Sequence, residues 1–249
     1  VSAEFKIPDA EALEEMLRAK NYHAFRSASE EIPAVDLAEI MSDISDEYRT
    51  VFFRLLSKEK ASDVFVEMDS DVKETLIHRL NDRELRAVMD ELFLDDTVDI
   101  IEEMPASVVK RVLAQSDSET RAYINEILKY PKDSAGSIMT IEFVALRKTM
   151  TVEQAFERIR KTAIDKETIY TCYVTEGRRL IGLVTVKDLL LAQDDEPPIQ
   201  DIMLTNLISV NTHTDQEEVA RMFSKYNFLA LPVVDKEDRM LGIVTFDDA

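Results

Sequence analysis

Apolar residues in the first half of the chain recur at helical spacing in many short segments. One such set runs from Leu37 to Ile44, and further sets follow it up to Leu80. Each set covers only about two or three turns, which is too short for a helix that is stable on its own. Start signals separate the sets, for example Asn81 with Glu84 three residues later. This half is therefore predicted to be all helical, with its short helices stacked on one another.

Comparison of this half with itself reveals a recurrence. The stretch Asp63–Met68 returns 36 residues later as Asp99–Met104, and a looser third copy runs from Leu37 through Ile44. Recurrence of this kind is typical of repeat architectures, in which each unit buries its apolar face against its neighbours. It predicts a right-handed, solenoid-like stack of helix pairs, and an irregular helical bundle is the alternative.

From about Lys132 onward the pattern changes to alternating or β-rich runs around one helical stretch, Val152–Lys161. The β-rich runs are Phe143–Leu146, Thr171–Val174 and Leu180–Val184. All four glycines of the chain lie at or beyond Gly136. The second half is therefore predicted to be an α/β structure.

The motifs of this second half return in a second copy. Ile138-Met139 returns as Ile202-Met203, Thr151–Gln154 as Thr214–Glu217, and Leu180–Asp188 as Met240–Asp248. Each copy has the order strand, capped helix, strand, turn and a Gly-apolar-Val-Thr strand that ends in Thr-x-x-Asp. The second copy stops at Ala249, where its last helix is expected to begin, so we expect that helix to be truncated.

Charge limits the partners that this chain can take. It holds 50 acidic and 30 basic side chains, a formal net charge of −20, and both halves share the acidic excess. This negative charge disfavours binding to nucleic acid, which depends on Lys and Arg side chains that neutralise phosphates. Cations and basic surfaces of other proteins remain as candidate partners. No apolar run approaches the roughly 20 residues of a spanning helix. The single Cys172 and the absence of a signal peptide fit a reducing compartment.

The inventory of possible metal ligands favours hard cations. Three histidines and one cysteine stand against fifty carboxylates, and oxygen ligands suit Mg²⁺ or Ca²⁺. Facing carboxylates repel each other, so a divalent cation between two acidic domains favours their closed arrangement. Glycine-rich phosphate loops and His-Glu-x-x-His are absent from the sequence. We therefore expect a protein that is not an enzyme.

The repeated motifs from Ser137 onward resemble a pair of CBS domains. With the acidic short-helix half ahead of them and Ala135–Thr140 at the junction, the whole chain resembles the cytosolic part of the MgtE-type magnesium transporters. The resemblance implies a multidomain α + α/β chain, with an all-α superhelical domain at 1–131 and a tandem CBS pair at 132–199 and 200–249. It also implies a homodimer formed through the CBS domains, a C-terminal transmembrane pore domain and a place on the cytoplasmic face of the cell membrane.

In that family, Mg²⁺ ions bridge acidic residues of the helical and CBS domains and close the pore. The positions that match these acids are Asp63, Asp95, Asp99, Glu217, Asn227 and Asp248. Asn227 departs from the pattern, because it keeps an oxygen but loses a charge. Local alternatives exist for the acids: a capping box of Thr214 with Glu217, a helix first turn for Asp248, an N-terminal cap for Asp95, and a solvated face for Asp63.

A second set of residues resembles the nucleotide-binding positions of CBS domains. There, a Thr-x-x-Asp motif reaches the ribose of an adenosine ligand, and the matching residues are Thr185, Asp188 and Thr245, the last with Asp248. Lys187 is placed to meet phosphate, while Tyr170 and Phe228 are placed to pack on the base. The alternative is that the motif only caps helices.

Three functions follow from these features. The first is a regulatory, Mg²⁺-sensing region of a magnesium transporter. The second is an adenine-nucleotide sensor that responds to ATP or AMP without sensing metal directly. The third is a scaffold that binds neither ligand.

Overall fold

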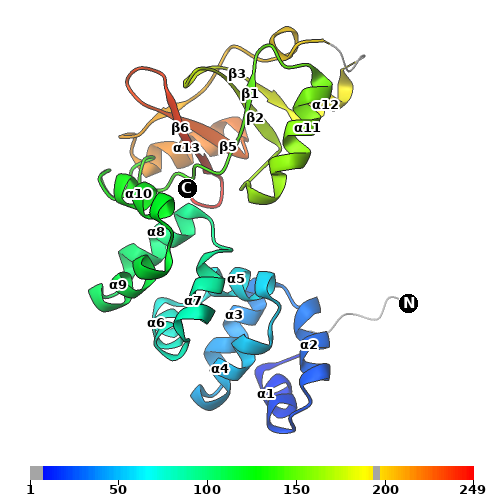
Figure 1. The fold of residues 1–249 in the computed structure, drawn as a ribbon, viewed down its shortest axis with the longest axis vertical. Coiled ribbons are helices and arrows are strands. Elements are labelled where there is room, and N and C mark those ends of the chain that lie inside the picture. Colours follow the sequence, from blue (N-terminus) through cyan, green and yellow to red (C-terminus); the bar gives the residue numbers. More distant parts are fainter. Residues whose placement is uncertain (1–7, 193–196) are drawn as a thin grey trace. The chain divides into compact units, whose positions relative to one another are not determined.

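The computed structural model of the chain describes residues 8–192 and 197–249, and it confirms the predicted fold class (Figure 1). The chain divides into two compact units. One holds Val1–Leu92 with Asp96–Arg121, and the other holds Ala122–Ala249 with Phe93–Asp95. Within the part of the chain that the structure describes, none of the helices has the length and apolarity that crossing a bilayer requires.

Ten short helices follow one another at a nearly fixed spacing in the described part of the first half, between residues 10 and 127. They are α1 (Ala10–Arg18), α2 (Tyr22–Glu31), α3 (Ala34–Asp43), α4 (Asp46–Leu55), α5 (Lys58–Glu67), α6 (Ser70–Arg79), α7 (Asp82–Met89), α8 (Leu94–Glu103), α9 (Ala106–Gln115) and α10 (Ser118–Ile127). Successive helices begin at positions 10, 22, 34, 46 and so on to 118, a spacing of 12 residues. This regularity confirms the all-helical prediction.

Most of the connections between these helices consist of two residues with different tasks. The first is often an apolar residue that turns into the core, such as Ile32, Ile44 or Met68. The second precedes the next helix and is a residue that suits a helix start, for example Pro33 or Ser45. The apolar residue ends one helix in an extended conformation and anchors the turn, so each helix stops after about three turns.

The helices pack in two rows of alternate members. Helix α3 packs against α5, α5 against α7, and α7 against α9, while α4 packs against both α2 and α6. Helices of the odd row begin at 10, 34, 58, 82 and 106, so the packing repeat is 24 residues. The 36-residue recurrence in the sequence therefore does not correspond to one helix pair. It relates α5 to α8, which are three helices apart, because every helix carries a similar apolar face.

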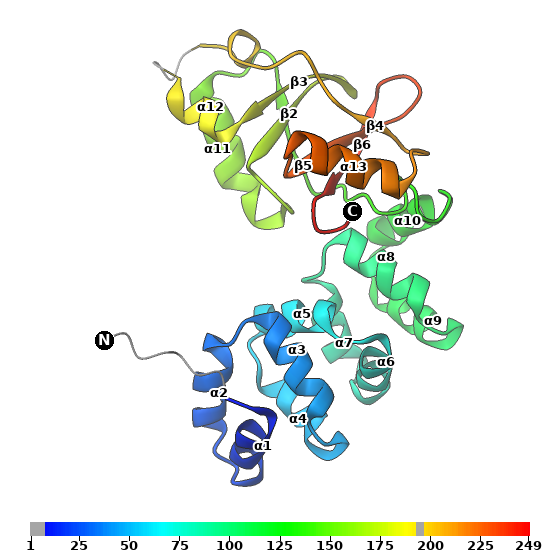
Figure 2. The same ribbon diagram turned by 180° about the vertical axis from the view of Figure 1, so that it is seen from behind.

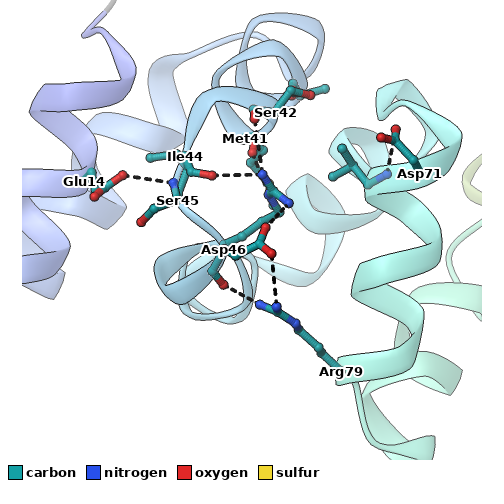
Figure 3. A network of polar contacts seen from close by, with 11 residues as sticks. Glu14, Met41, Ser42, Ile44, Ser45, Asp46, Asp71 and Arg79 are labelled. Atoms are coloured by element: carbon teal, nitrogen blue, oxygen red, sulfur yellow. Dashed lines mark hydrogen bonds and ion pairs between the residues drawn. The ribbon is translucent and has the colours of Figure 1, made fainter.

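Arginine side chains link the ends of these helices through hydrogen bonds and ion pairs. Arg49 donates Nε to the carbonyl of Met41 and Nη2 to that of Ile44, both at 2.9 Å. These carbonyls belong to the last turn and C-cap of α3 and have no partner within their helix. Arg49 Nη1 also pairs with Asp46 at 2.6 Å, and Asp46 in turn bonds Arg79 of α6 (Figure 3).

The described residues of the second unit form two small sheets with the same topology (Figure 2). Its elements are β1 (Val144–Arg147), α11 (Val152–Thr162), η1 (Ala163–Asp165), β2 (Thr171–Glu176), β3 (Arg179–Thr185), α12 (Val186–Leu191), η2 (Ile199–Asp201), β4 (Val210–Asn211), α13 (Gln216–Tyr226), β5 (Ala230–Val234) and β6 (Met240–Thr245). In each sheet the first strand is parallel to the middle one, and the third is antiparallel to it. The predicted tandem α/β repeat is therefore confirmed.

The segment that precedes each repeat pairs with the sheet of the other repeat. Thr140 exchanges two backbone hydrogen bonds with Ile243 of β6, at 2.8 and 2.9 Å. Leu204 exchanges two with Leu183 of β3, at 2.8 and 3.0 Å. This crossed pairing makes the two repeats one folding unit, because neither sheet is complete without the leading segment of the other copy.

Candidate functional site

A cleft of about 580 Å³ opens where the two repeats meet within the second unit. The first repeat contributes the start of β2 and the segment from Thr185 through α12, and the second contributes 227–229. Four of the residues predicted to bind nucleotide line it: Tyr170, Thr185, Lys187 and Phe228. The volume lies in the range of small-molecule sites, and the lining joins apolar surface to one cation.

Aromatic rings are available at this cleft. Tyr170 directly precedes β2, and 65% of its surface is exposed. Its carbonyl accepts a hydrogen bond from Val186 N at 3.0 Å, which fixes the start of β2 against the start of α12. Phe228 is half-buried and stacks on Tyr226, with ring centroids 5.4 Å apart. Each repeat thus contributes one aromatic ring to the lining of the cleft, which is the kind of surface that a flat aromatic group packs against.

The predicted Thr-x-x-Asp pair of the first repeat forms a capping box. Asp188 Oδ2 accepts from Thr185 N at 3.0 Å and from Thr185 Oγ1 at 2.6 Å, while Asp188 N donates back to that hydroxyl at 3.1 Å. These bonds match the alternative in which the motif caps a helix, and Asp188 is not among the residues that line the cleft. The ribose contact of Asp188 stays a prediction.

The second copy of this motif lies elsewhere. Thr245 is 5% exposed, does not line the cleft, and donates its hydroxyl proton to Asp248. The backbone nevertheless repeats closely, since Phe246 N donates to the Leu229 carbonyl at 3.1 Å, as Val186 does to Tyr170. The two copies therefore share their scaffold and differ in their side chains.

The side-chain difference inverts the local charge. The first copy reads Thr185-Val-Lys-Asp188, whereas the second reads Thr245-Phe-Asp-Asp248. An exposed lysine at position 187 thus corresponds to an exposed aspartate at position 247. The first copy suits the phosphates of an anionic ligand, and the second disfavours an anion but suits a cation.

Asp248, one of the predicted metal ligands, lies where its ionised form is disfavoured. It is half-buried, and this burial raises the pKa of its carboxyl above the ordinary value. The neighbouring Asp247 raises that pKa further, while the hydroxyl of Thr245 opposes the shift. A carboxylate in this position gains from a nearby cation, so the Asp247-Asp248 pair fits a hard metal ion chemically.

Glu217 is free of the capping role that its spacing from Thr214 suggested. The N-cap of α13 is Asp215, whose side chain accepts from Glu217 N at 2.9 Å, and Thr214 Oγ1 instead accepts from Asn211 N at 3.0 Å. The alternative capping box is therefore wrong for the second repeat. The exposed carboxylate of Glu217 pairs with Arg221 at 2.9 Å.

The acids on the short helices differ in exposure. Asp63 of α5 and Asp99 of α8 are exposed, whereas Asp95 is only 6% exposed and is grouped with the second unit. Within residues 8–192 and 197–249, no three His, Cys, Asp or Glu side chains gather closely enough to hold a metal ion. The metal role of these acids stays a prediction.

Asn227 lines the cleft between the two repeats, although it was predicted as a metal ligand. It is the C-cap of α13, with φ 56° and ψ 39°, in the left-handed region that asparagine tolerates better than most residues. Leu190, Leu191 and Leu229 also line the cleft, and they were not predicted. Between 60 and 69% of the surface of these leucines is exposed in the structure, and the sequence alone does not show which leucines are exposed.

Two family models match the chain. The model of the MgtE intracellular N domain matches residues 32–133, and the CBS domain model matches 135–195 and 199–249. Among curated proteins, the magnesium transporter MgtE of Thermus thermophilus is 38% identical over 244 residues, which are 96% of this chain and 54% of that protein. MgtE of Bacillus subtilis is 30% identical over 234 residues, 94% of this chain and 52% of that protein. The chain thus spans about half the length of these relatives.

Solved structures agree with this similarity. The cytosolic domain of the Mg²⁺ channel MgtE in complex with ATP is 38% identical, with a TM-score of 0.89 over 96% of this chain and 98% of that one. The soluble part of a magnesium transporter is 30% identical, with a TM-score of 0.87 over 96% of this chain and 94% of that one.

Proposed function

Because this chain belongs to the MgtE family and comprises its N domain and CBS pair, we propose that it is the regulatory, Mg²⁺-sensing region of a magnesium transporter. It is not an enzyme in this proposal, and it lies on the cytoplasmic face of the membrane, joined to a transmembrane pore domain. Two copies associate through their CBS pairs. Mg²⁺ held by acidic residues of the helical and CBS domains favours a closed gate.

The observation that carries the proposal is the Asp247-Asp248 pair that follows β6. Asp248 is half-buried beside a second carboxylate, so its negative charge costs free energy in the absence of a counterion. A divalent cation removes that cost, and magnesium typically uses only one or two carboxylates together with its own waters. Asp95, Asp99, Glu217 and Asp63 are the further acids of the proposal. Sites of this kind bind weakly, which suits a sensor of an abundant ion.

Small-angle X-ray scattering during a magnesium titration tests this proposal. Sodium chloride keeps the ionic strength constant, so that simple screening does not contribute. We expect magnesium, and not sodium, to reduce the radius of gyration at constant mass. The variant Asp95→Asn with Asp248→Asn is expected to need at least about tenfold more magnesium for the same compaction.

A matched control removes two acids elsewhere. Asp43→Asn with Asp201→Asn changes the net charge equally, and both side chains are exposed. This control is expected to keep the magnesium midpoint of the unchanged protein. A radius of gyration that does not respond to magnesium contradicts the sensor proposal, and equal shifts in both variants assign the response to overall charge.

Adenine-nucleotide binding is the second function, and the cleft lined by Tyr170, Lys187 and Phe228 favours it. The similar MgtE cytosolic domain whose structure was solved with ATP also supports it. Because Asp247 replaces the lysine in the second copy, we propose one nucleotide for each chain.

Calorimetry with ATP in EDTA tests the nucleotide site. We expect one ATP bound per chain and an affinity at least about tenfold lower in Lys187→Ala, since a charge-assisted phosphate contact is lost. Lys236→Ala, which removes an exposed cation from a turn, serves as the control. Two equivalent nucleotides per chain, or no effect at Lys187, would contradict this assignment.

A further inference from the structure

Three cations gather at a hollow on the first CBS repeat that shares no residue with the nucleotide cleft. Arg147 comes from the end of β1, and Arg158 and Lys161 come from α11. The hollow has a volume of about 420 Å³. We call this surface the basic hollow and define it by Arg147, Thr149, Gln154, Glu157, Arg158 and Lys161.

Local geometry explains why these side chains converge. Gln154, Arg158 and Lys161 are spaced four and three residues apart on α11, so they share one face of the helix. Helix α11 packs along β1, whose last residue is Arg147. Thr149 lies in the turn between them and adds a hydroxyl to the same surface. The hollow is therefore built on two regular elements and the short connection between them.

The three cations of the hollow have no ion-pair partner among the residues that the structure describes. None of Arg147, Arg158 and Lys161 forms an ion pair with another residue of the described ranges, 8–192 and 197–249. Two neighbouring cations do have partners, since Lys148 pairs with Glu176 at 2.5 Å and Arg160 lies 5.6 Å from the ring centroid of Phe156. The donors that line the hollow are thus the ones that remain available to a ligand.

The charge of the hollow is opposite to that of the molecule. Its lining carries three cations and one carboxylate, Glu157, in a chain with a net charge of −20. Guanidinium groups present several N–H donors in one plane and match the oxygens of phosphate. An anion at this place gains hydrogen bonds to charged donors, together with the hydroxyl of Thr149 and the amide of Gln154.

We propose that the basic hollow is a second anion site, separate from the nucleotide cleft, which binds a phosphate-bearing ligand. Its volume accommodates a diphosphate or a small phosphorylated molecule. The same donors fit the phosphate of an anionic lipid headgroup, so the test has one arm for each source.

The first arm uses pyrophosphate and isothermal titration calorimetry without divalent metal. Every protein is the full 249-residue chain with Lys187→Gln, which removes the cation of the nucleotide cleft. We expect pyrophosphate to bind at one site per chain, and to bind at least about tenfold more weakly when Arg158→Gln and Lys161→Gln are added. Both side chains are exposed, so the fold is not expected to change.

The matched control is Arg178→Gln with Lys236→Gln. It removes the same two charges from exposed positions in the turns after β2 and β5. The titration is made at an ionic strength of about 0.1 M, where Coulomb interactions across water are screened within about 10 Å, so we expect the affinity of this control for pyrophosphate to stay within about twofold of the parent. Equal weakening in both double variants overturns the proposal, since it assigns the binding to overall charge.

The second arm measures sedimentation of the same proteins with vesicles. Retention on phosphatidylglycerol vesicles and not on phosphatidylcholine, lost in Arg158→Gln with Lys161→Gln only, identifies a lipid headgroup as the source. Pyrophosphate binding without vesicle retention identifies a free phosphorylated molecule. Absence of both pyrophosphate and vesicle binding overturns the proposal.

Discussion

Asn227 has a role that its place in the sequence did not reveal. The family resemblance assigns it to a metal site, with a missing charge as its only peculiarity. In the structure it ends α13 in the left-handed conformation, where the lack of a β-branch and a short polar side chain are what the backbone requires. The same residue then lines the nucleotide cleft. The left-handed backbone explains why a short polar side chain stands here, but Asp133 and Asp238 adopt the same conformation, so the backbone does not account for the missing charge.

Capping bonds decide the roles of other single residues. Asp188 accepts hydrogen bonds from the backbone N–H and the hydroxyl of Thr185. Asp215 is the N-cap of α13, so Glu217 does not cap that helix and forms an ion pair with Arg221 instead. A Thr-x-x-acid spacing in the sequence describes both positions equally well. Only the φ and ψ angles at the helix start decide which side chain is used.

Asp248→Asn is expected to stabilise the protein at neutral pH in EDTA. The pKa of Asp248 is raised in the folded state, so the ionised carboxylate is disfavoured there relative to the unfolded chain. Stability due to this group is therefore lowest above the folded pKa, and it is regained as the pH falls toward the ordinary aspartate value near 4. The gain of the asparagine variant in thermal midpoint is thus expected at pH 7 and expected to vanish near pH 4.

Thermal unfolding followed by circular dichroism at pH 7 and pH 4 measures this difference. Asp201→Asn, at an exposed position, is the control and is expected to change neither midpoint. A lower midpoint for Asp248→Asn at pH 7 would mean that the fold stabilises the carboxylate, which contradicts the raised pKa.

At the scale of elements, the segments that precede each repeat explain why both repeats have a glycine in their last strand. The segment around Thr140 pairs with β6 of the second repeat, and the segment around Leu204 pairs with β3 of the first. A Cβ at Gly242 would overlap the carbonyl oxygen of Thr140, and one at Gly182 would lie 2.6 Å from the sulfur of Met203. The leading segment of one repeat thus passes directly over the hairpin of the other. Glycine is required at both places by close approach.

Gly242→Ala is expected to cost more stability than Gly182→Ala. In the first case the added methyl group meets a backbone oxygen, which moves only if the Thr140–Ile243 pairing changes. In the second it meets mainly the end of a flexible methionine side chain, which can rotate. Overpacking of this kind costs about 1–3 kcal/mol, and we expect Gly242→Ala at the upper end.

Urea unfolding of the two variants checks this order. Gly177 has φ 65° and open space where a Cβ would lie, so Gly177→Asn, which tolerates that conformation, is the control and is expected to have little effect. Equal losses in Gly242→Ala and Gly182→Ala would indicate that the leading segment adjusts freely, and that the crossed pairing contributes little to stability.

For the whole molecule the dominant quantity is its acidic excess. Most of the ion pairs in the described residues are local or link neighbouring helices, and 50 acids face only 30 bases. Exposed pairs contribute little, whereas an uncompensated net charge works against the compact state. Cations in solution are therefore part of what stabilises this protein.

Sodium chloride is expected to raise the thermal midpoint of the chain. Between about 20 and 200 mM the Debye length falls from about 20 to about 7 Å, which screens repulsion among unpaired carboxylates. A rise of a few degrees is expected, because the repulsion due to the net charge of −20 outweighs the weakened surface pairs. Differential scanning fluorimetry at several salt concentrations measures it, and a midpoint that falls with salt would show that the ion pairs dominate.

Much of the secondary structure and the repeat organisation of this protein could be predicted from local periodicity in the sequence. Helical spacing in short segments predicted the stacked helices, the duplicated motifs predicted two α/β repeats, and the acid excess with few soft ligands pointed to hard cations. These features depend on neighbours within a few residues, such as apolar spacing, caps and turns, and such interactions can be read along the chain.

Tertiary structure alone decided which distant residues meet. The 24-residue packing repeat, the crossed pairing of Thr140 and Leu204, and the leucines of the cleft all join segments that are separated in the sequence. Similar apolar faces on every helix make several alignments of the repeat equally plausible from the sequence. Backbone hydrogen bonds and close packing select one of them, and these long-range contacts leave no local pattern.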